Sequence, residues 1–268
     1  MKVVIKGAGD LATGIGARLK KCGFTIIMTD ISVPTAVRRT VAFSRAVYEG
    51  TATVEGITAE YAKNDDEIEC ILQRGNIPVI VDEQAEIVRK WKPDVVVDAI
   101  LAKKNLHTKI TDASLVIGVG PGFEAKKDCH LVVETKRGHY LGRVIYEGTA
   151  IPNTGIPGNI GGYTVERIIR SVCDGVFHPV AQIGDYVEKG DIVAYSEKEP
   201  IYASITGIVR GMLQEGVVVT KGMKSGDIDP RCEKEHCFTI SDKARSIAGG
   251  VLEGILTHFQ KEIFGKEK

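Results

Sequence analysis

A glycine-rich turn near the N-terminus has the residue types that bind phosphates. Residues Gly7–Ala12 fit the pattern G-x-G-x-x-A, between a β-branched run, Lys2–Lys6, and a stretch with helical spacing. In dinucleotide-binding folds such glycines let the backbone approach a pyrophosphate, and an acid at the end of the second strand binds the ribose. The pattern predicts a nucleotide-type ligand, with Gly7, Gly9, Asp10, Ala12 and Asp30 as the candidate binding residues. A turn that serves only close packing remains the alternative.

An acid in this turn, Asp10, argues against the simplest version of that interpretation. At a helix N-terminus its carboxylate caps free amides and suits the helix dipole. It would also repel a phosphate from the position that phosphates normally occupy. Three alternatives stay open: a cation bridges Asp10 and the phosphate, the phosphate lies further along the loop, or the turn has lost its original cofactor.

Arginines follow the second predicted strand. Arg38 and Arg39 lie in the run RRTVAFSR, which ends at Arg45. Guanidinium groups at this edge can hold a phosphate with two parallel hydrogen bonds. We therefore include Arg38 and Arg39 among the candidate ligand-binding residues. A solvated, charged surface is the equally simple alternative.

The densest group of polar residues lies in the middle of the chain, in GVGPGFEAKKDCHLVVETKRGHYLGR. Its glycines follow an apolar run and are expected at the carboxyl end of a strand, where open α/β sheets bind ligands. Histidines there could move protons near neutral pH. The candidate binding residues are Gly120, Gly122, His130, Glu134, Arg137 and His139. A strand-turn-strand with exposed polar side chains remains the alternative.

The cysteines do not indicate a metal site. Cys129 lies beside lysines and His130, a setting that can activate a thiol, but we interpret it as an ordinary thiol. Cys232 and Cys237 have the spacing C-x4-C without a second pair, whereas structural zinc needs four ligands. We expect no metal.

The surrounding elements predict an α/β protein. Continuous apolar strands alternate with helical stretches in the first half, which favours a Rossmann-like, doubly wound parallel sheet. After the glycine-rich loop 153–162, a helix is predicted over 163–171, followed by short strands with Gly-Asp turns. The helical period after Ser241 predicts a C-terminal helix. The expected domains are residues 1–165, a β barrel-sandwich module at 166–240, and a helix at 241–268 that packs on the body.

The β module contains GDYVEKGD, residues 184–191, a half-motif of biotinyl and lipoyl carrier domains. Lys198 falls near the expected hairpin tip, but its neighbours Glu197 and Glu199 match neither carrier signature. We therefore expect Lys198 to be unmodified and the module to serve docking or positioning.

Composition excludes some classes of partner. The chain has 35 basic and 35 acidic residues, so there is no global charge to attract nucleic acid or an anionic membrane. No apolar run approaches the ~18 residues of a membrane span. The six scattered cysteines are typical of a reducing compartment, and we expect a cytoplasmic protein.

Seven separated motifs resemble the YqeB family. They are KGAGDLATG, RRTVAFSRAVYEG, GPGF, ETKRGHYLGR, NTGIPG, GDIDPR and SDKAR, and together they span nearly the whole chain. This family is described as accessory proteins of selenium-dependent molybdenum hydroxylases, related in its Rossmann-like part to XdhC maturation factors. The resemblance also marks positions in the C-terminal part: Asp229, Arg231, Asp242, Lys243 and Arg245.

The resemblance implies a maturation factor that binds an anionic ligand and handles selenium or sulfur insertion for a molybdenum hydroxylase client. The candidate ligands are molybdopterin dinucleotide, a nucleotide or NAD(P). An NAD(P)-dependent oxidoreductase and a non-catalytic chaperone of a molybdoenzyme are the alternatives. Whether the chain is an enzyme, and whether it forms a homo-oligomer, stays open.

Overall fold

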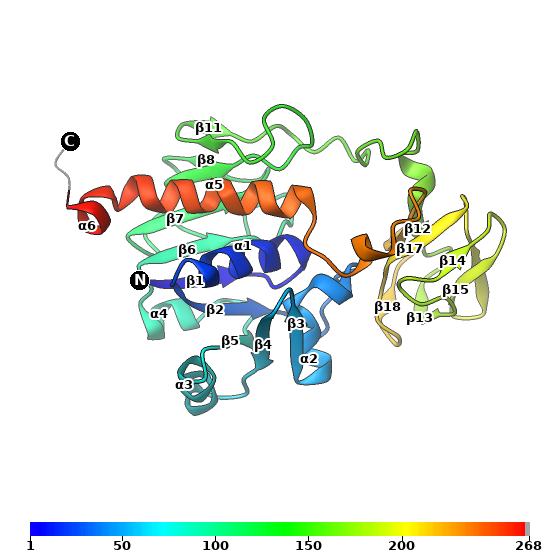
Figure 1. The fold of residues 1–268 in the computed structure, drawn as a ribbon, viewed down its shortest axis with the longest axis horizontal. Helices are drawn as coiled ribbons and strands as arrows, with labels where there is room; N and C mark the ends of the chain where they lie inside the picture. Colours follow the sequence, from blue (N-terminus) through cyan, green and yellow to red (C-terminus); the bar gives the residue numbers. More distant parts are fainter. Residues whose placement is uncertain (266–268) are drawn as a thin grey trace. The chain divides into compact units, whose positions relative to one another are not determined.

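The computed structural model describes residues 1–265, which form two compact units (Figure 1). The first unit contains Met1–Ser32, Phe43–Asn153 and the described residues from Ile240 onward. The second unit contains Val33–Ala42 and Thr154–Thr239. The chain therefore passes between the units four times, and a short segment before Phe43 belongs to the second unit. No helix within the described residues has the length and apolar composition to cross a membrane.

A nine-stranded mixed sheet forms the centre of the first unit, in the order β10-β9-β7-β6-β1-β2-β5-β4-β3. The seven strands from β9 to β4 are parallel, and β10 and β3 pair antiparallel at the two edges. The bounds are β1 (Lys2–Lys6), β2 (Thr25–Asp30), β3 (Thr51–Val54), β4 (Ile57–Tyr61), β5 (Ile77–Val81), β6 (Val95–Asp98), β7 (Leu115–Val119), β9 (Leu131–Val133) and β10 (Val144–Ile145).

Two long helices, α1 (Asp10–Lys21) and α5 (Asp242–His258), run side by side on one face of this sheet (Figure 1). Gly14 permits their close approach, because a Cβ there would lie 2.8 Å from the Cβ of Ala244. The Ser241 side chain caps α5 by accepting a hydrogen bond from the amide of Ala244, at 3.2 Å, as the sequence predicted. The structure therefore places the last long helix against the first.

The other face is covered mainly by short elements. These are α3 (Asp65–Gln73), α4 (Ile87–Trp91) and a two-stranded sheet of β8 (Glu124–Ala125) and β11 (Gly148–Thr149). The remaining short helices of this unit are η2 (Phe43–Arg45), α2 (Ala46–Glu49) and α6 (Gln260–Phe264).

The second unit consists of two four-stranded antiparallel sheets, ordered β12-β19-β17-β14 and β16-β15-β13-β18. They share an apolar core that includes Phe177, Val209 and Met212, each fully buried. The elements are η1 (Arg39–Val41), η3 (Val165–Arg167), β12 (Ile168–Arg170), β13 (Gly175–Pro179), β14 (Tyr186–Val187), β15 (Ile192–Ser196), β16 (Glu199–Tyr202), β17 (Gly207–Met212), β18 (Val218–Val219), β19 (Lys224–Asp229) and η4 (Lys234–Cys237).

The predicted fold class is wrong. The main sheet is mixed rather than wholly parallel, and β6 and β7 are joined without a helix. The second unit has two separate antiparallel sheets in place of a biotinyl-like barrel-sandwich. The helix predicted over 163–171 is also absent, because Ile168–Arg170 pairs as strand β12 with β19. Lys198 lies in the two-residue turn between β15 and β16.

Candidate functional site

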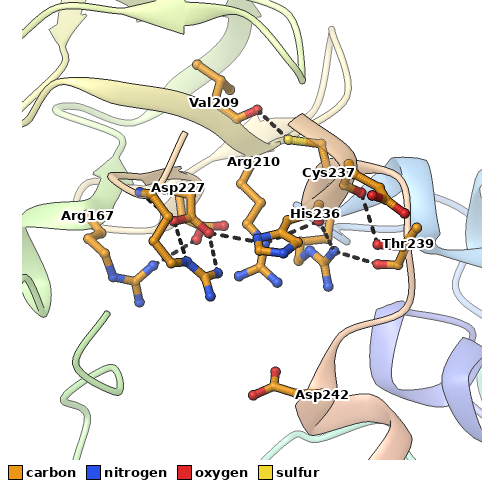
Figure 2. A network of polar contacts seen from close by, with 12 residues as sticks. Arg167, Val209, Arg210, Asp227, His236, Cys237, Thr239 and Asp242 are labelled. Atoms are coloured by element: carbon orange, nitrogen blue, oxygen red, sulfur yellow. Dashed lines mark hydrogen bonds and ion pairs between the residues drawn. The ribbon is translucent and has the colours of Figure 1, made fainter. Parts of the chain in front are cut away.

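A cluster of arginine and aspartate side chains lies in the second unit (Figure 2). Strand β19 supplies Asp227 and Asp229, whose side chains share a face because successive residues of a strand alternate. Arg210 comes from the adjacent strand β17, and Arg167 ends η3 just before β12 on the other side. These four side chains are 2–9% exposed, so the cluster is largely buried.

The aspartates are paired with arginines. Nη1 of Arg167 donates to Oδ2 of Asp227 at 3.1 Å. Arg231 donates from Nε and Nη2 to the two carboxylate oxygens of Asp229, at 2.9 and 2.6 Å. Hydrogen bonds from Arg231 and the charges of Arg231 and Arg210 lower the pKa of Asp229, although burial acts to raise it. Asp229 is therefore held as a carboxylate.

Arg38, one of the residues predicted to bind ligand, also belongs to this unit. Its Nη2 donates to the carbonyl oxygens of His236 and Thr239, at 2.8 and 3.1 Å. Arg39 donates from Nε to the carbonyl oxygen of Met212 at 3.2 Å. The two arginines therefore anchor the segment before Phe43 to the second unit, instead of lying in one unit with the glycine turn.

Among these arginines, Arg210 forms only long contacts with acceptor oxygens. Its Nε lies 3.4 Å from the carbonyl oxygen of His236 and 3.8 Å from Oδ2 of Asp229. No residue within 1–265 accepts a hydrogen bond from its Nη1 or Nη2. Burial lowers the pKa of Arg210, and the charge of Arg38 lowers it further. Figure 2 shows the side chains of Arg167 and Arg210 extending in the same direction. A planar guanidinium fork with two unused donors is a group that binds oxyanions.

Two further polar atoms in the cluster are buried without a hydrogen bond among the described residues: Nε of Arg167 and Nδ1 of His236. Buried polar atoms are usually satisfied, so such atoms need an explanation. The cluster contains four arginines (Arg38, Arg167, Arg210 and Arg231) and two aspartates (Asp227 and Asp229). The unused donors favour a small anion.

The glycine turn of the first unit has the predicted local structure. Some of its backbone amides already donate hydrogen bonds within the protein. Gly7 has φ +93°, and a Cβ there would lie 2.9 Å from the carbonyl oxygen of Ala99. Asp30 accepts hydrogen bonds from the amides of Ala8 and Ile31, at 2.9 and 2.8 Å. Burial raises the pKa of Asp30, partly offset by these two bonds. Asp30 therefore holds the turn itself.

Three other predicted residues lie around this turn. Gly9 is the N-cap of α1, Asp10 is the first residue of that helix, and Ala12 is buried inside it. A Cβ at Gly9 would have open space around it. A ligand at this turn stays a prediction.

The polar residues predicted to form one site in the middle of the chain lie at both ends of strand β9. His130 lies just before β9, where its Nδ1 accepts a hydrogen bond from the amide of Val116 at 3.0 Å. Glu134 follows the other end of β9. It accepts hydrogen bonds from the amides of Thr135, Lys136 and Ile151, at 2.7, 2.7 and 2.8 Å. Glu134 is 2% exposed, so its contacts fix the local backbone.

The remaining members of that group have separate contacts. Arg137 forms a bidentate ion pair with Asp242, at 2.7 and 2.8 Å, and His139 packs its exposed ring edge against Tyr140. A Cβ at Gly120 would lie 2.7 Å from Oγ1 of Thr135, and one at Gly122 would lie 2.6 Å from the amide nitrogen of Lys104. The two glycines therefore permit close packing.

The cysteines are placed in different environments. Cys129 is fully buried, and burial raises the pKa of its thiol to about 11. This is the opposite of the shift that activates a thiol for sulfur or selenium chemistry. Cys237 is buried beside the arginine cluster, with Sγ 3.7 Å from the carbonyl oxygen of Val209 (Figure 2). Cys232 is exposed.

Sequence reasoning missed Arg167, Arg210 and Asp227. Two signals were present: a lone arginine within the apolar run GIVRGM, and two acids at alternate positions in GDIDPR. A charge inside an otherwise apolar strand indicates a buried, compensated group.

No family model matches the chain. Among solved structures, it resembles an aspartoacylase family protein from Mesorhizobium loti, with 10% identity, coverage of 85% of this chain and 84% of that one, and a TM-score of 0.26. A succinylglutamate desuccinylase from Silicibacter aligns with 11% identity, the same coverage and a TM-score of 0.25. An ectoine utilization protein from Ruegeria pomeroyi aligns with 13% identity and a TM-score of 0.26. Scores this low transfer neither a fold nor an activity to this chain.

The predicted role in maturing selenium-dependent molybdenum hydroxylases is contradicted and is not retained, and neither are the molybdenum-cofactor and selenium assignments. Within the chain, the buried Cys129 thiol and the internally paired Arg137 give no support to that chemistry.

One relative is much more similar in sequence than these solved structures are. The uncharacterized protein YqeB of Escherichia coli (strain K12) is 50% identical over 254 residues, which cover 95% of this chain. The match covers 47% of that relative, so this chain spans about half its length. The comparison supports the YqeB family for this chain, as its seven motifs predicted.

Proposed function

We propose that this chain binds a small phosphate-type anion at the arginine cluster of its second unit. The observation that carries the proposal is Arg210, a residue 7% exposed whose Nη1 and Nη2 reach solvent and have no acceptor among the described residues. Two donors of one guanidinium fork can bind an anion bidentately, and the low exposure of the residue strengthens such a pairing.

Neighbouring groups support the same ligand. Arg167 is held by Asp227 through Nη1, which leaves its buried Nε without a partner among residues 1–265. Nδ1 of His236 is likewise buried and unused. The ion pairs of Asp227 and Asp229 hold the arginines in place before a ligand arrives, which reduces the entropy lost on binding.

Thermal unfolding in the presence of inorganic phosphate tests this function. A ligand present at about 100 times its Kd stabilises the folded state by about 2.7 kcal/mol, so the Tm of the chain should rise by several degrees in phosphate compared with chloride of equal ionic strength. Arg210→Gln should abolish the rise.

Arg170→Gln is the matched control, because Arg170 is an exposed arginine of the same unit, in β12. It should keep the full phosphate response. A response that is equal in Arg210→Gln and Arg170→Gln would show that phosphate acts elsewhere or through general screening, and would refute the proposal.

A further inference from the structure

A cavity of about 580 Å³ lies in the first unit, beside the edge strand β10. Its walls combine aromatic and aliphatic side chains with a single arginine, and they include Tyr140, Arg143, Ile145, Tyr146 and Ile151. Small-molecule pockets have this size and this mixture, mostly apolar with a few polar groups that fix the ligand. The cavity is separate from the arginine cluster, whose residues all belong to the second unit.

Three large apolar side chains of this cavity are accessible to solvent. Tyr140 is 51% exposed, Tyr146 47% and Ile151 37%. A ligand that covers them removes apolar surface from water, and aromatic rings also prefer to pack against other rings. The cavity therefore favours a ligand with an apolar, ring-shaped body.

The two acids that line the cavity already have partners. Glu134 accepts hydrogen bonds from three backbone amides, and these use both of its carboxylate oxygens. Oε2 of Glu147 lies 2.9 Å from Nζ of Lys126, and the hydrogen bond from Lys126 lowers the pKa of Glu147. Neither acid therefore offers an unpaired carboxylate to a cationic ligand.

Arg143 is the cation of this cavity, and no carboxylate within residues 1–265 pairs with it. Its guanidinium lies over the ring of Tyr140, with 5.4 Å between Cζ and the ring centroid. This cation–π contact restricts the guanidinium without giving its N–H donors an acceptor oxygen. The donors can therefore bind a carboxylate through two parallel hydrogen bonds.

We infer that this cavity binds a small aromatic carboxylate. Arg143 binds the carboxylate, whose single negative charge balances the one unpaired cation of the lining, and the ring of the ligand packs against Tyr146 and Ile151. The hydroxyl of Thr149, which also lines the cavity, adds a hydrogen-bond donor. This site is independent of the proposed function, because it shares no residue with the arginine cluster.

Calorimetric titration of the full chain with three probes tests this inference: 2-naphthoate, its neutral amide 2-naphthamide, and acetate. We expect 2-naphthoate to bind at least tenfold more tightly than 2-naphthamide, which lacks the charge, and than acetate, which lacks the ring. Arg143→Gln should weaken the binding of 2-naphthoate at least tenfold and change that of 2-naphthamide little. Tyr146→Leu should weaken both naphthyl probes by about two- to tenfold, because a ring contact is lost.

Two arginine variants serve as controls. Arg89→Gln changes an exposed arginine of the same unit, in α4 and outside the cavity lining, and Arg210→Gln changes the arginine cluster. Both should bind 2-naphthoate as the wild-type chain does. Absence of 2-naphthoate binding at millimolar concentration, equal affinities for 2-naphthoate and 2-naphthamide, or equal losses in Arg143→Gln and Arg89→Gln would overturn the inference. A loss in Arg210→Gln as large as that in Arg143→Gln would overturn it too, because the carboxylate would then bind at the arginine cluster.

Discussion

Nε of Arg210 lies 3.8 Å from Oδ2 of Asp229, an oxygen that already accepts a hydrogen bond from Arg231 at 2.6 Å. Asp229 is 1% exposed, so one buried carboxylate serves two guanidinium groups. This shared carboxylate holds the two guanidinium groups beside one another.

Asp229→Asn should destabilise the chain strongly. The substitution removes the charge that compensates Arg231 and Arg210, and breaking a buried ion pair typically costs about 3–5 kcal/mol. Urea unfolding of the two proteins measures the difference. Added phosphate should restore part of it, because an anion at Arg210 replaces some of the lost charge. A variant as stable as wild type would show that Asp229 does not hold the cluster together.

His130 predicts a pH dependence of stability. Burial lowers its pKa, and the charge of nearby His258 lowers it further. The unfolded chain therefore binds a proton more readily at this position, and the free energy of unfolding should fall as the pH drops below about 6.5, through the lowered pKa of the folded state. His130→Asn should remove this contribution while keeping an acceptor for the amide of Val116. Parallel stability curves for both proteins between pH 8 and 5 would contradict this account.

The glycine turn gives a matched pair of substitutions. Gly7→Ala should cost about 1–3 kcal/mol or more, because φ is +93° and the new Cβ would lie 2.9 Å from the carbonyl oxygen of Ala99. Gly9→Ala should stay within about 1 kcal/mol of wild type, because φ is −67° and the Cβ enters open space. Denaturant midpoints report both values, and an equal loss in the two variants would refute the argument.

The sequence predicted well those features that depend on neighbouring residues. The strand at Lys2–Lys6, the turn at Gly7 and the cap at Ser241 are set by β-branched residues, a positive φ and a side-chain acceptor, all of which act within a few positions. Each of these lies where it was predicted.

Features that depend on distant partners were missed. Val165, Ile168, Ile169 and Val172 have helical spacing, but pairing with β19 makes Ile168–Arg170 a strand, as its β-branched residues also favour. The arginine cluster combines residues separated by up to 193 positions, from Arg38 to Arg231, so no local pattern could reveal it. His130 and Glu134 are close in sequence but lie at opposite ends of β9.

The most direct test of the account is the Kd of inorganic phosphate measured by calorimetry for the wild-type chain, Arg210→Gln and Arg170→Gln. Hydrogen bonds to charged groups are worth about 1.5–3 kcal/mol each, so loss of the Arg210 fork should weaken binding at least tenfold, whereas Arg170→Gln should bind as wild type does. A Kd for Arg210→Gln equal to that of wild type would contradict the central claim.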